Sequence, residues 1–266
     1  MSSKMTTSNI TGDRIKQYLE EGKRFDGRKL DEFRDISIET GVSENAEGSA
    51  RVKIGKTEVL VGVKMAVGNP YDDSPDKGNM MVTAELLPLS SPRFENGPPK
   101  FPAIELGRIT DRAVRESKVI DFEKLCIEKG EKVWTVFIDV YSINDDGNLL
   151  DAAGIGAIAA LKNAKVPFYD KETGKIDYKK EPTGPLALAK QIPLSVSVHK
   201  IGDNFIVDPT REEEDISETR IVVGSADGVI SSMQKSFDQS LTTEEMGKVL
   251  DLADKTWKTV SKKLSL

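Results

Sequence analysis

The sequence predicts an α+β fold made of two similar halves, with elements in the order strands, helix, strand, helix, strands, helix. Three observations lead to this prediction. Apolar residues alternate or run continuously between glycine-marked turns in two separate regions, and helical periodicity is confined to a few segments. A charged, proline-containing stretch precedes the second set of strands. We divide the chain into an N-terminal helical extension (1–23), a first half (24–150) and a second half (151–266) that pack as one unit.

The first half begins as a sheet after a short helix predicted at 11–22, which Gly22 ends. Three strand-like segments follow: "DISIETG", "GSARVKIG" and "TEVLVGVKMAVG". A loop rich in Pro, Gly and Asp (69–80) separates them from the apolar segment "VTAELLPLSS". A helix is then expected at 103–120 and a buried strand at 131–143.

The second half opens with the alanine-rich helix predicted at 151–164. Residues 167–185 contain three prolines and many charges, which is typical of an excursion or small hairpin. Four strands are expected in "IPLSVSVHK", "NFIVDPT", "TRIVVGSA" and "GVISSMQKS". The last helix has a cap at Thr242 with Glu245 three residues later. Its apolar face consists of Met246, Val249, Leu250, Ala253, Trp257, Val260 and Leu264.

Composition narrows the functional classes. The formal charge of −6 argues against bulk attraction to nucleic acid, so any RNA contact must come from a local patch of cations. One cysteine, Cys126, excludes an internal disulfide and a cysteine-cluster metal site, and we expect it in the core. The one histidine, His199, lies in a strand pattern, where a structural role is expected and a Ser/His/Asp triad is not. Abundant Lys and Glu are compatible with a heat-adapted source.

The chain has no run of eighteen apolar residues, and its first residues lack the apolar stretch of a secretion signal. We therefore expect a soluble cytoplasmic protein without a membrane partner.

Three arginines in "AIELGRITDRAVRESKVI" form a stripe on the predicted helix. Arg108, Arg112 and Arg115 recur at i, i+4 and i+7, so their guanidinium groups share one face and can each make forked bonds to phosphate oxygens. The core face would carry Leu106, Ile109 and Ala113. The alternative is a solvated surface of ion pairs, in which Glu105, Asp111 and Glu116 pair with Arg108, Arg115 and Arg112 respectively.

The segment "RFDGRKLDEFR" (24–34) resembles the N-terminal signature of the RNase PH family, and the similarity extends over roughly residues 24–260. Within the family the chain is most similar to the non-catalytic RNase-PH-type subunit of the archaeal exosome ring. The resemblance implies an RNase PH-like fold and a hexamer in which three copies of this chain alternate with three copies of a catalytic partner around an RNA channel. It also implies that the complex degrades RNA from its 3′ end by phosphorolysis, and cap proteins that bind RNA are further possible partners.

The resemblance implies a phosphate site at the start of the alanine-rich helix, where active relatives carry a hydroxyl and an arginine. Gly154 and Ile155 stand at those two positions. The bare helix N-terminus can still attract an anion, but without side-chain donors it would hold phosphate poorly. The alternative is structural: Gly154 and Gly156 let the helix pack closely on the sheet while Ile155 faces an apolar neighbour.

The resemblance also places the family's catalytic acids in "VDPTREEEDISETR". Asp208 matches the first aspartate, Glu214 takes the position of the second with Asp215 beside it, and Arg220 replaces a further acidic residue. Considered alone, 212–215 is typical of a solvated acidic run.

We therefore predict a subunit without catalytic residues, cofactor or metal, which binds and positions single-stranded RNA through Arg112 and Arg115, together with Arg108. Two alternatives stay open. One is an active phosphate-dependent 3′→5′ exoribonuclease that uses Asp208 with Glu214 or Asp215. The other is an architectural spacer of the ring.

Overall fold

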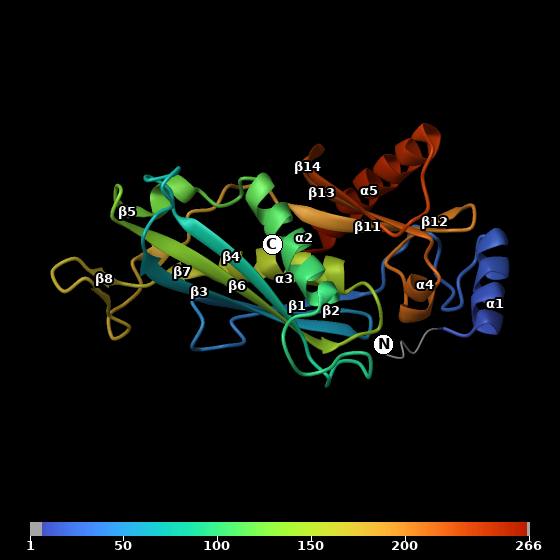
Figure 1. Cartoon of the computed structure of the whole chain (residues 1–266), viewed down its shortest axis with the longest axis horizontal. Helices are drawn as coiled ribbons and strands as arrows, with labels where there is room; N and C mark the ends of the chain where they lie inside the picture. Colours follow the sequence, from blue (N-terminus) through green and yellow to red (C-terminus); the bar gives the residue numbers. More distant parts are fainter. Residues whose placement is uncertain (1–6, 265–266) are drawn as a thin grey trace.

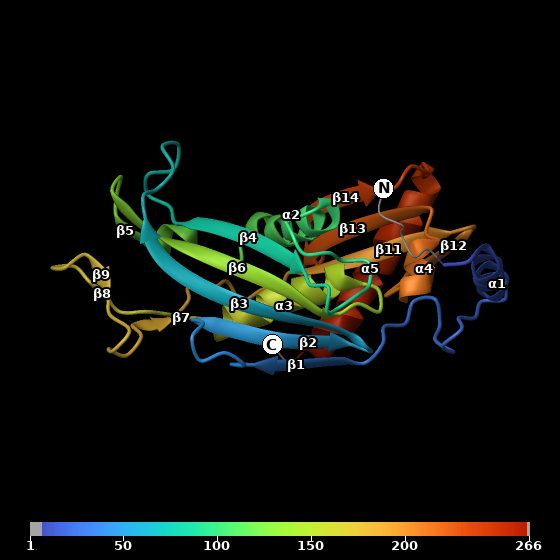
Figure 2. The ribbon, with the colours of Figure 1, turned by 60° about the horizontal axis from the view of Figure 1, so that its bottom comes forward.

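The computed structural model describes residues 7–264 of the chain and contains two main sheets. The first sheet has the strand order β1–β2–β3–β6–β4, with β5 paired to the end of β6. Its strands are β1 (Ile36–Thr40), β2 (Gly48–Ile54), β3 (Thr57–Gly68), β4 (Asn79–Leu86), β5 (Cys126–Glu128) and β6 (Lys132–Asn144). All neighbours are antiparallel except β4, which runs parallel to β6 and forms one edge (Figure 2).

The second sheet is antiparallel throughout, in the order β12–β11–β13–β14. Its strands are β11 (Leu194–Ile201), β12 (Asn204–Val207), β13 (Thr219–Ala226) and β14 (Val229–Ser236). The predicted excursion at 167–185 forms two short pairs at one end of the elongated molecule (Figure 1). They are β7 (Lys165–Val166) with β10 (Gly184–Pro185), and β8 (Tyr169–Asp170) with β9 (Lys175–Ile176).

The helices follow the predicted order, which confirms the α+β class. They are α1 (Asn9–Glu20), α2 (Phe101–Glu116), the 3₁₀ turn η1 (Phe122–Leu125), α3 (Leu149–Asn163), the short α4 (Arg211–Asp215) and α5 (Thr243–Lys263). Helix α2 ends earlier than the predicted residue 120, because Lys118 adopts a left-handed conformation with φ of 55°. In the described part of the chain, no helix is long and apolar enough to cross a membrane.

Helix α3 lies between the two sheets and is buried from Leu149 to Leu161. Gly156 faces the first sheet so closely that an added Cβ would lie 2.6 Å from Val61 Cγ2. Gly154 faces the second sheet, where an added Cβ would lie 3.7 Å from the Cβ of Ser195. The predicted close packing is confirmed at Gly156, whereas an alanine at position 154 would make only an ordinary contact. Helix α3 is the central layer of the molecule.

Helix α5 covers the outer side of the second sheet. The predicted capping box is present, since the Thr242 side chain accepts from Glu245 N–H and the Glu245 carboxylate accepts from Thr242 N–H. The predicted apolar face also packs against the core. The expectation that Cys126 belongs to the core was wrong: it is half-buried, because it opens β5 at the end of the sheet.

Candidate functional site

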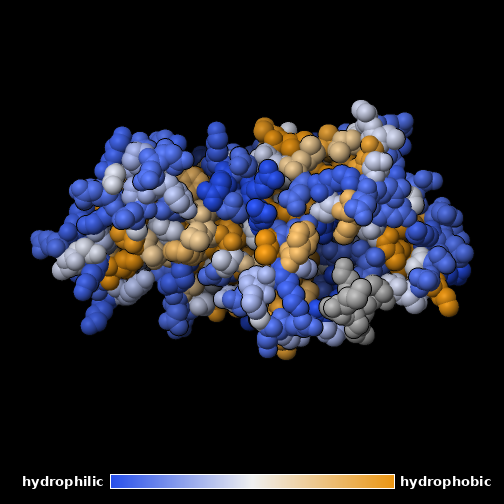
Figure 3. Space-filling view, viewed as in Figure 1, coloured by the Kyte–Doolittle hydropathy of each residue, from blue (hydrophilic) through white to orange (hydrophobic). Residues whose placement is uncertain are grey.

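Helix α2 carries the predicted arginine stripe on a well-formed amphipathic helix. Pro102 stands in its first turn, where its missing N–H and fixed φ cost nothing. The predicted core face is confirmed, since Leu106, Ile109 and Ala113 are all buried. The opposite face lies on the surface at the middle of the molecule, where a strongly hydrophilic area adjoins hydrophobic ones (Figure 3).

The three arginines differ in what they contact. Arg108 and Arg112 are exposed, and neither forms an ion pair with any residue between 7 and 264. Arg115 is half-buried: its Nη2 donates to Asp111 Oδ1 (2.7 Å) and to the backbone oxygen of Met80 (3.0 Å). The hydrogen bond to Asp111 raises the pKa of Arg115. Two cations are thus free for an external anion and the third holds α2 against β4.

Of the three ion pairs in the alternative interpretation, the structure forms only Asp111–Arg115. Glu105 instead accepts hydrogen bonds from Arg220 Nη2 (2.6 Å) and Ser236 Oγ (2.7 Å). The buried Arg220 on β13 needs a carboxylate partner more than the solvated Arg108 does. The alternative of a fully paired surface is therefore wrong, since only one of its three ion pairs is formed.

The N-terminus of α3, where the resemblance places a phosphate site, is filled by carboxylates of the same chain. Asn148, the residue before the helix, has a left-handed backbone, and its N–H donates to Glu214 Oε2 (3.1 Å). Its side-chain Nδ2 donates to Asp208 Oδ1 (2.8 Å). Asp151, in the first turn, is buried and accepts from both the N–H (2.9 Å) and the hydroxyl (2.7 Å) of Ser197. Burial raises the pKa of Asp151 to about 7.

Asp208 is fully buried and held by two arginines. Its Oδ2 accepts from Arg28 Nη1 (2.8 Å) and Arg34 Nε (2.9 Å), and its Oδ1 accepts from Arg34 Nη2 (2.7 Å). Burial acts to raise its pKa, but the hydrogen bond and charge of Arg34, with the charge of Arg28, hold it below its usual value. With Asn148 included, both carboxylate oxygens are satisfied.

Glu214 and Asp215 are also engaged. Glu214 pairs with Arg211 (3.2 Å) and more distantly with Arg220 (3.8 Å). Asp215 receives a forked pair of bonds from Arg93, 2.5 and 2.6 Å long.

The prediction that 212–215 is a solvated acidic run was wrong. The run belongs to α4, whose capping box joins Thr210 to Glu213. Glu213 is buried against Arg24. Burial is possible because every carboxylate that turns inward meets an arginine.

Sequence reasoning missed the residues that neutralise these acids. Arg24, Arg28 and Arg34 come from the motif that carries the family resemblance, yet nothing in its residue pattern indicates where they bind. Arg24 Nη1 donates to Val207 O (3.0 Å) and Arg34 Nη1 to Asp146 O (2.9 Å). The motif therefore ties residues 24–34 to the loops before α3 and after β12.

His199 is fully buried on β11, where its Nδ1 lies 3.1 Å from Ser217 Oγ. Burial, together with the nearby charge of Arg220, lowers its pKa well below the ordinary value. A neutral, enclosed imidazole fits the predicted structural role.

Comparison with known proteins identifies relatives over nearly the whole chain. Models of the 3′ exoribonuclease family (RNase PH) match residues 32–167 with domain 1 and residues 191–256 with domain 2. The Exosome complex component Rrp42 of Thermococcus onnurineus is 48% identical, covering 95% of this chain and 93% of the relative. The protein of the same name from Methanothermobacter thermautotrophicus is 44% identical, covering 92% and 90%.

Two solved structures share the fold over 97% of this chain. A chain described as "archaeoglobus fulgidus exosome with RNA bound to the active site" superposes with a TM-score of 0.89 at 43% identity, with 98% of that chain covered. A chain of an "Archaeal exosome core" gives a TM-score of 0.85 at 40% identity, with 97% covered.

Proposed function

Because this chain belongs to the RNase PH family of 3′ exoribonucleases, we propose that it is a non-catalytic subunit of an archaeal exosome ring. The similarity to proteins named Rrp42 and to chains of archaeal exosomes spans nearly its full length, which supports this assignment. In the proposed hexamer, three copies alternate with three copies of a catalytic RNase-PH-type partner. The complex shortens RNA from the 3′ end by phosphorolysis in the cytoplasm, and RNA-binding cap proteins are further proposed partners.

The main support for a non-catalytic role is that every candidate catalytic acid is neutralised. Asp208, Glu214 and Asp215 are each bound by arginines of the same chain. Asp208 and Asp215 accept hydrogen bonds on both oxygens, so their lone pairs are directed at protein donors rather than at a Mg²⁺ ion. The lowered pKa of Asp208 also makes it a poor proton donor. Glu214 is neutralised by its ion pair with Arg211.

The N-terminus of α3 is also unfavourable for phosphate, because a carboxylate of the same chain lies there. The N–H of Asn148 points at the Glu214 carboxylate, which already supplies the negative charge that a helix N-terminus favours. A second anion would have to displace Glu214 or be repelled by it. The proposed role of the site is therefore structural, and no cofactor or metal is assigned to it.

The proposed contribution to RNA degradation is binding and positioning of single-stranded RNA by α2. Arg108 and Arg112 are one helical turn apart, exposed and unpaired among the described residues, so both can bond phosphates of one strand. Arg115 is held by Asp111 on the same helix and by the backbone oxygen of Met80 on β4. Phosphate contacts carry no base information, so they confer no sequence preference.

The test is a product assay with 3′-tailed single-stranded RNA, Mg²⁺ and inorganic phosphate. We expect the purified chain to release no nucleoside diphosphate, and the catalytic partner to do so when the two chains are mixed. The matched variant is Asp208→Asn. Phosphate-dependent shortening by the chain alone, abolished by Asp208→Asn, would replace this proposal with an active enzyme.

A further inference from the structure

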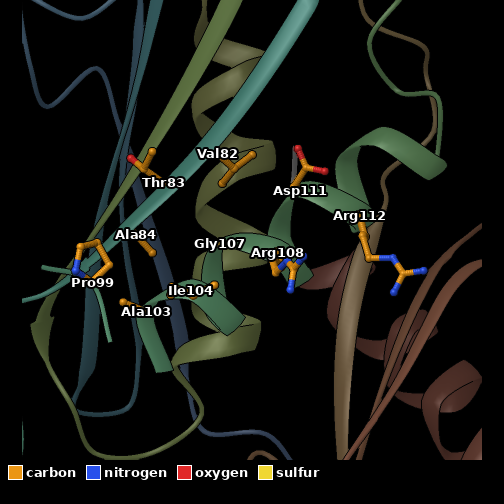
Figure 4. Close-up of a pocket in the computed structure, with 10 residues that line it drawn as sticks. All are labelled: Val82, Thr83, Ala84, Pro99, Ala103, Ile104, Gly107, Arg108, Asp111 and Arg112. Carbon is orange, nitrogen blue, oxygen red and sulfur yellow. The ribbon is translucent and has the colours of Figure 1, made fainter. Parts of the chain in front are cut away.

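A groove of about 380 Å³ lies between the edge strand β4 and helix α2. One wall is formed by Val82, Thr83 and Ala84, and the other by the face of α2 between Ala103 and Arg112 (Figure 4). Its volume lies within the range of sites that accept small organic groups. The groove also adjoins the proposed RNA-binding arginines, since Arg108 and Arg112 belong to its lining.

Two kinds of chemistry meet in this groove. Apolar groups make up most of its lining: Val82, Ala84, Pro99, Ala103, Ile104 and Gly107. Gly107 has no side chain, which lets α2 approach the backbone of β4 closely, while Ile104 is 47% exposed. The charged groups are Arg108, Arg112 and Asp111, and the charge of Asp111 is offset by Arg115. A ligand would therefore meet an apolar surface with two unpaired cations beside it.

We infer that this groove is a base-binding subsite, in which one base of single-stranded RNA lies on the apolar lining while its neighbouring phosphates contact Arg108 and Arg112. The inference rests on the proposed function and deepens it. A nucleotide combines a flat, largely apolar face with an anionic backbone, and this combination matches the two kinds of lining. Every base has such a face, so binding here tolerates any sequence.

A peptide strand paired to β4 fits the groove less well. The free edge of β4 is already covered: Met80 O accepts from Arg115 Nη2, 3.0 Å away. Further along, a Cβ on Gly107 would lie only 3.4 Å from Val82 O and 3.8 Å from Ala84 N. The helix leaves no room for a strand to reach these groups. An acidic peptide could bind the arginines, but it would leave the apolar lining unused.

The test compares two RNA oligonucleotides that differ only in whether one internal nucleotide carries a base. Binding to the purified full chain is measured at constant salt, with the abasic position moved along the strand. We expect the abasic change at one position to weaken binding about fivefold, as the loss of roughly 40 Å² of buried apolar surface would. In Ile104→Asn, and in Ile104→Asn with Val82→Thr, which make the groove lining polar, this difference should vanish while abasic RNA still binds.

The matched control is Ile10→Asn, the same change on an exposed isoleucine of α1. It should keep the preference for the base. Arg108→Ala with Arg112→Ala should weaken binding of both oligonucleotides equally.

Equal binding of the two RNAs to the unmodified chain would overturn the base-binding inference and leave the proposed function intact. So would a base preference that persists in both groove variants. Competition by an acidic peptide that Ile104→Asn abolishes would assign the groove to a protein ligand instead. If neither RNA binds, or if the arginine pair proves irrelevant to both, the proposed RNA-binding function itself fails.

Discussion

Asp208, Glu214 and Asp215 occupy positions where the family resemblance expects catalytic acids, but all three are held by arginines of the same chain. The sequence reveals the missing hydroxyl and arginine at Gly154 and Ile155. It does not reveal the neutralisation of the acids, because Arg28 and Arg34 lie 180 and 174 residues away from Asp208. Only the fold brings these charges together.

The ranking of Arg108, Arg112 and Arg115 also depends on contacts that only the fold reveals. Sequence reasoning preferred Arg112 and Arg115, although all three side chains carry the same charge at helical spacing and the pattern itself does not rank them. Their contacts distinguish them: Arg115 binds Asp111 and the carbonyl oxygen of Met80 on β4, whereas Arg108 and Arg112 are exposed. We now place Arg108 with Arg112 in the proposed RNA contact.

The buried Asp151 predicts a pH dependence of stability. Its pKa is raised from an ordinary value near 4 to about 7, so the neutral form is favoured in the folded chain. Its contribution to stability is therefore fully present below about pH 4 and is lost as the pH rises through about 7. In Asp151→Asn, which stays neutral, the free energy of unfolding should fall less between pH 5 and 8 than in the unmodified chain, as chemical denaturation can measure. Parallel pH profiles would contradict this account of Asp151.

Among the elements, α3 shows which properties of a helix can be predicted from its sequence. Its alanines and glycines indicated a closely packed helix, and both sheets do approach it closely. Which glycine faces which sheet could not be predicted, because every residue from Leu149 to Leu161 is buried and the sequence has no polar face. The buried faces of the arginine helix α2 and the capped helix α5 were easier to predict, because each helix has an apolar face and a polar one.

Two alanine substitutions in α3 provide a matched test of this packing. Gly156→Ala places a methyl group 2.6 Å from Val61 Cγ2, so the strand or the helix must shift, at a cost of about 1–3 kcal/mol. Gly154→Ala meets Ser195 Cβ at 3.7 Å, an ordinary contact, and should be neutral or stabilise by up to about 1 kcal/mol through helix propensity. Unfolding free energies measured in urea should separate the two variants. Equal values would show that α3 is not sandwiched as described.

In the whole molecule, the two sheets enclose α3, and ion pairs join its parts around Asp208. Arg34 binds both Asp208, which follows β12, and Asp146, which precedes α3. Arg24 reaches the buried Glu213 of α4. These ion pairs tie the N-terminal motif and α4 to the loop before α3. The surface that stays available for RNA is the exposed face of α2.

The central claim is that this chain binds RNA for a catalytic partner, and a kinetic assay of the assembled ring tests it most directly. The ring would contain the unmodified partner with this chain as wild type, Arg108→Glu with Arg112→Glu, or the control Lys171→Glu with Lys175→Glu at the far end of the molecule. We predict that the arginine variant raises KM for single-stranded RNA on the order of tenfold, because two phosphate contacts become repulsive, while kcat changes little. The control should match the wild type. An unchanged KM in the arginine variant would contradict the account and favour an architectural spacer.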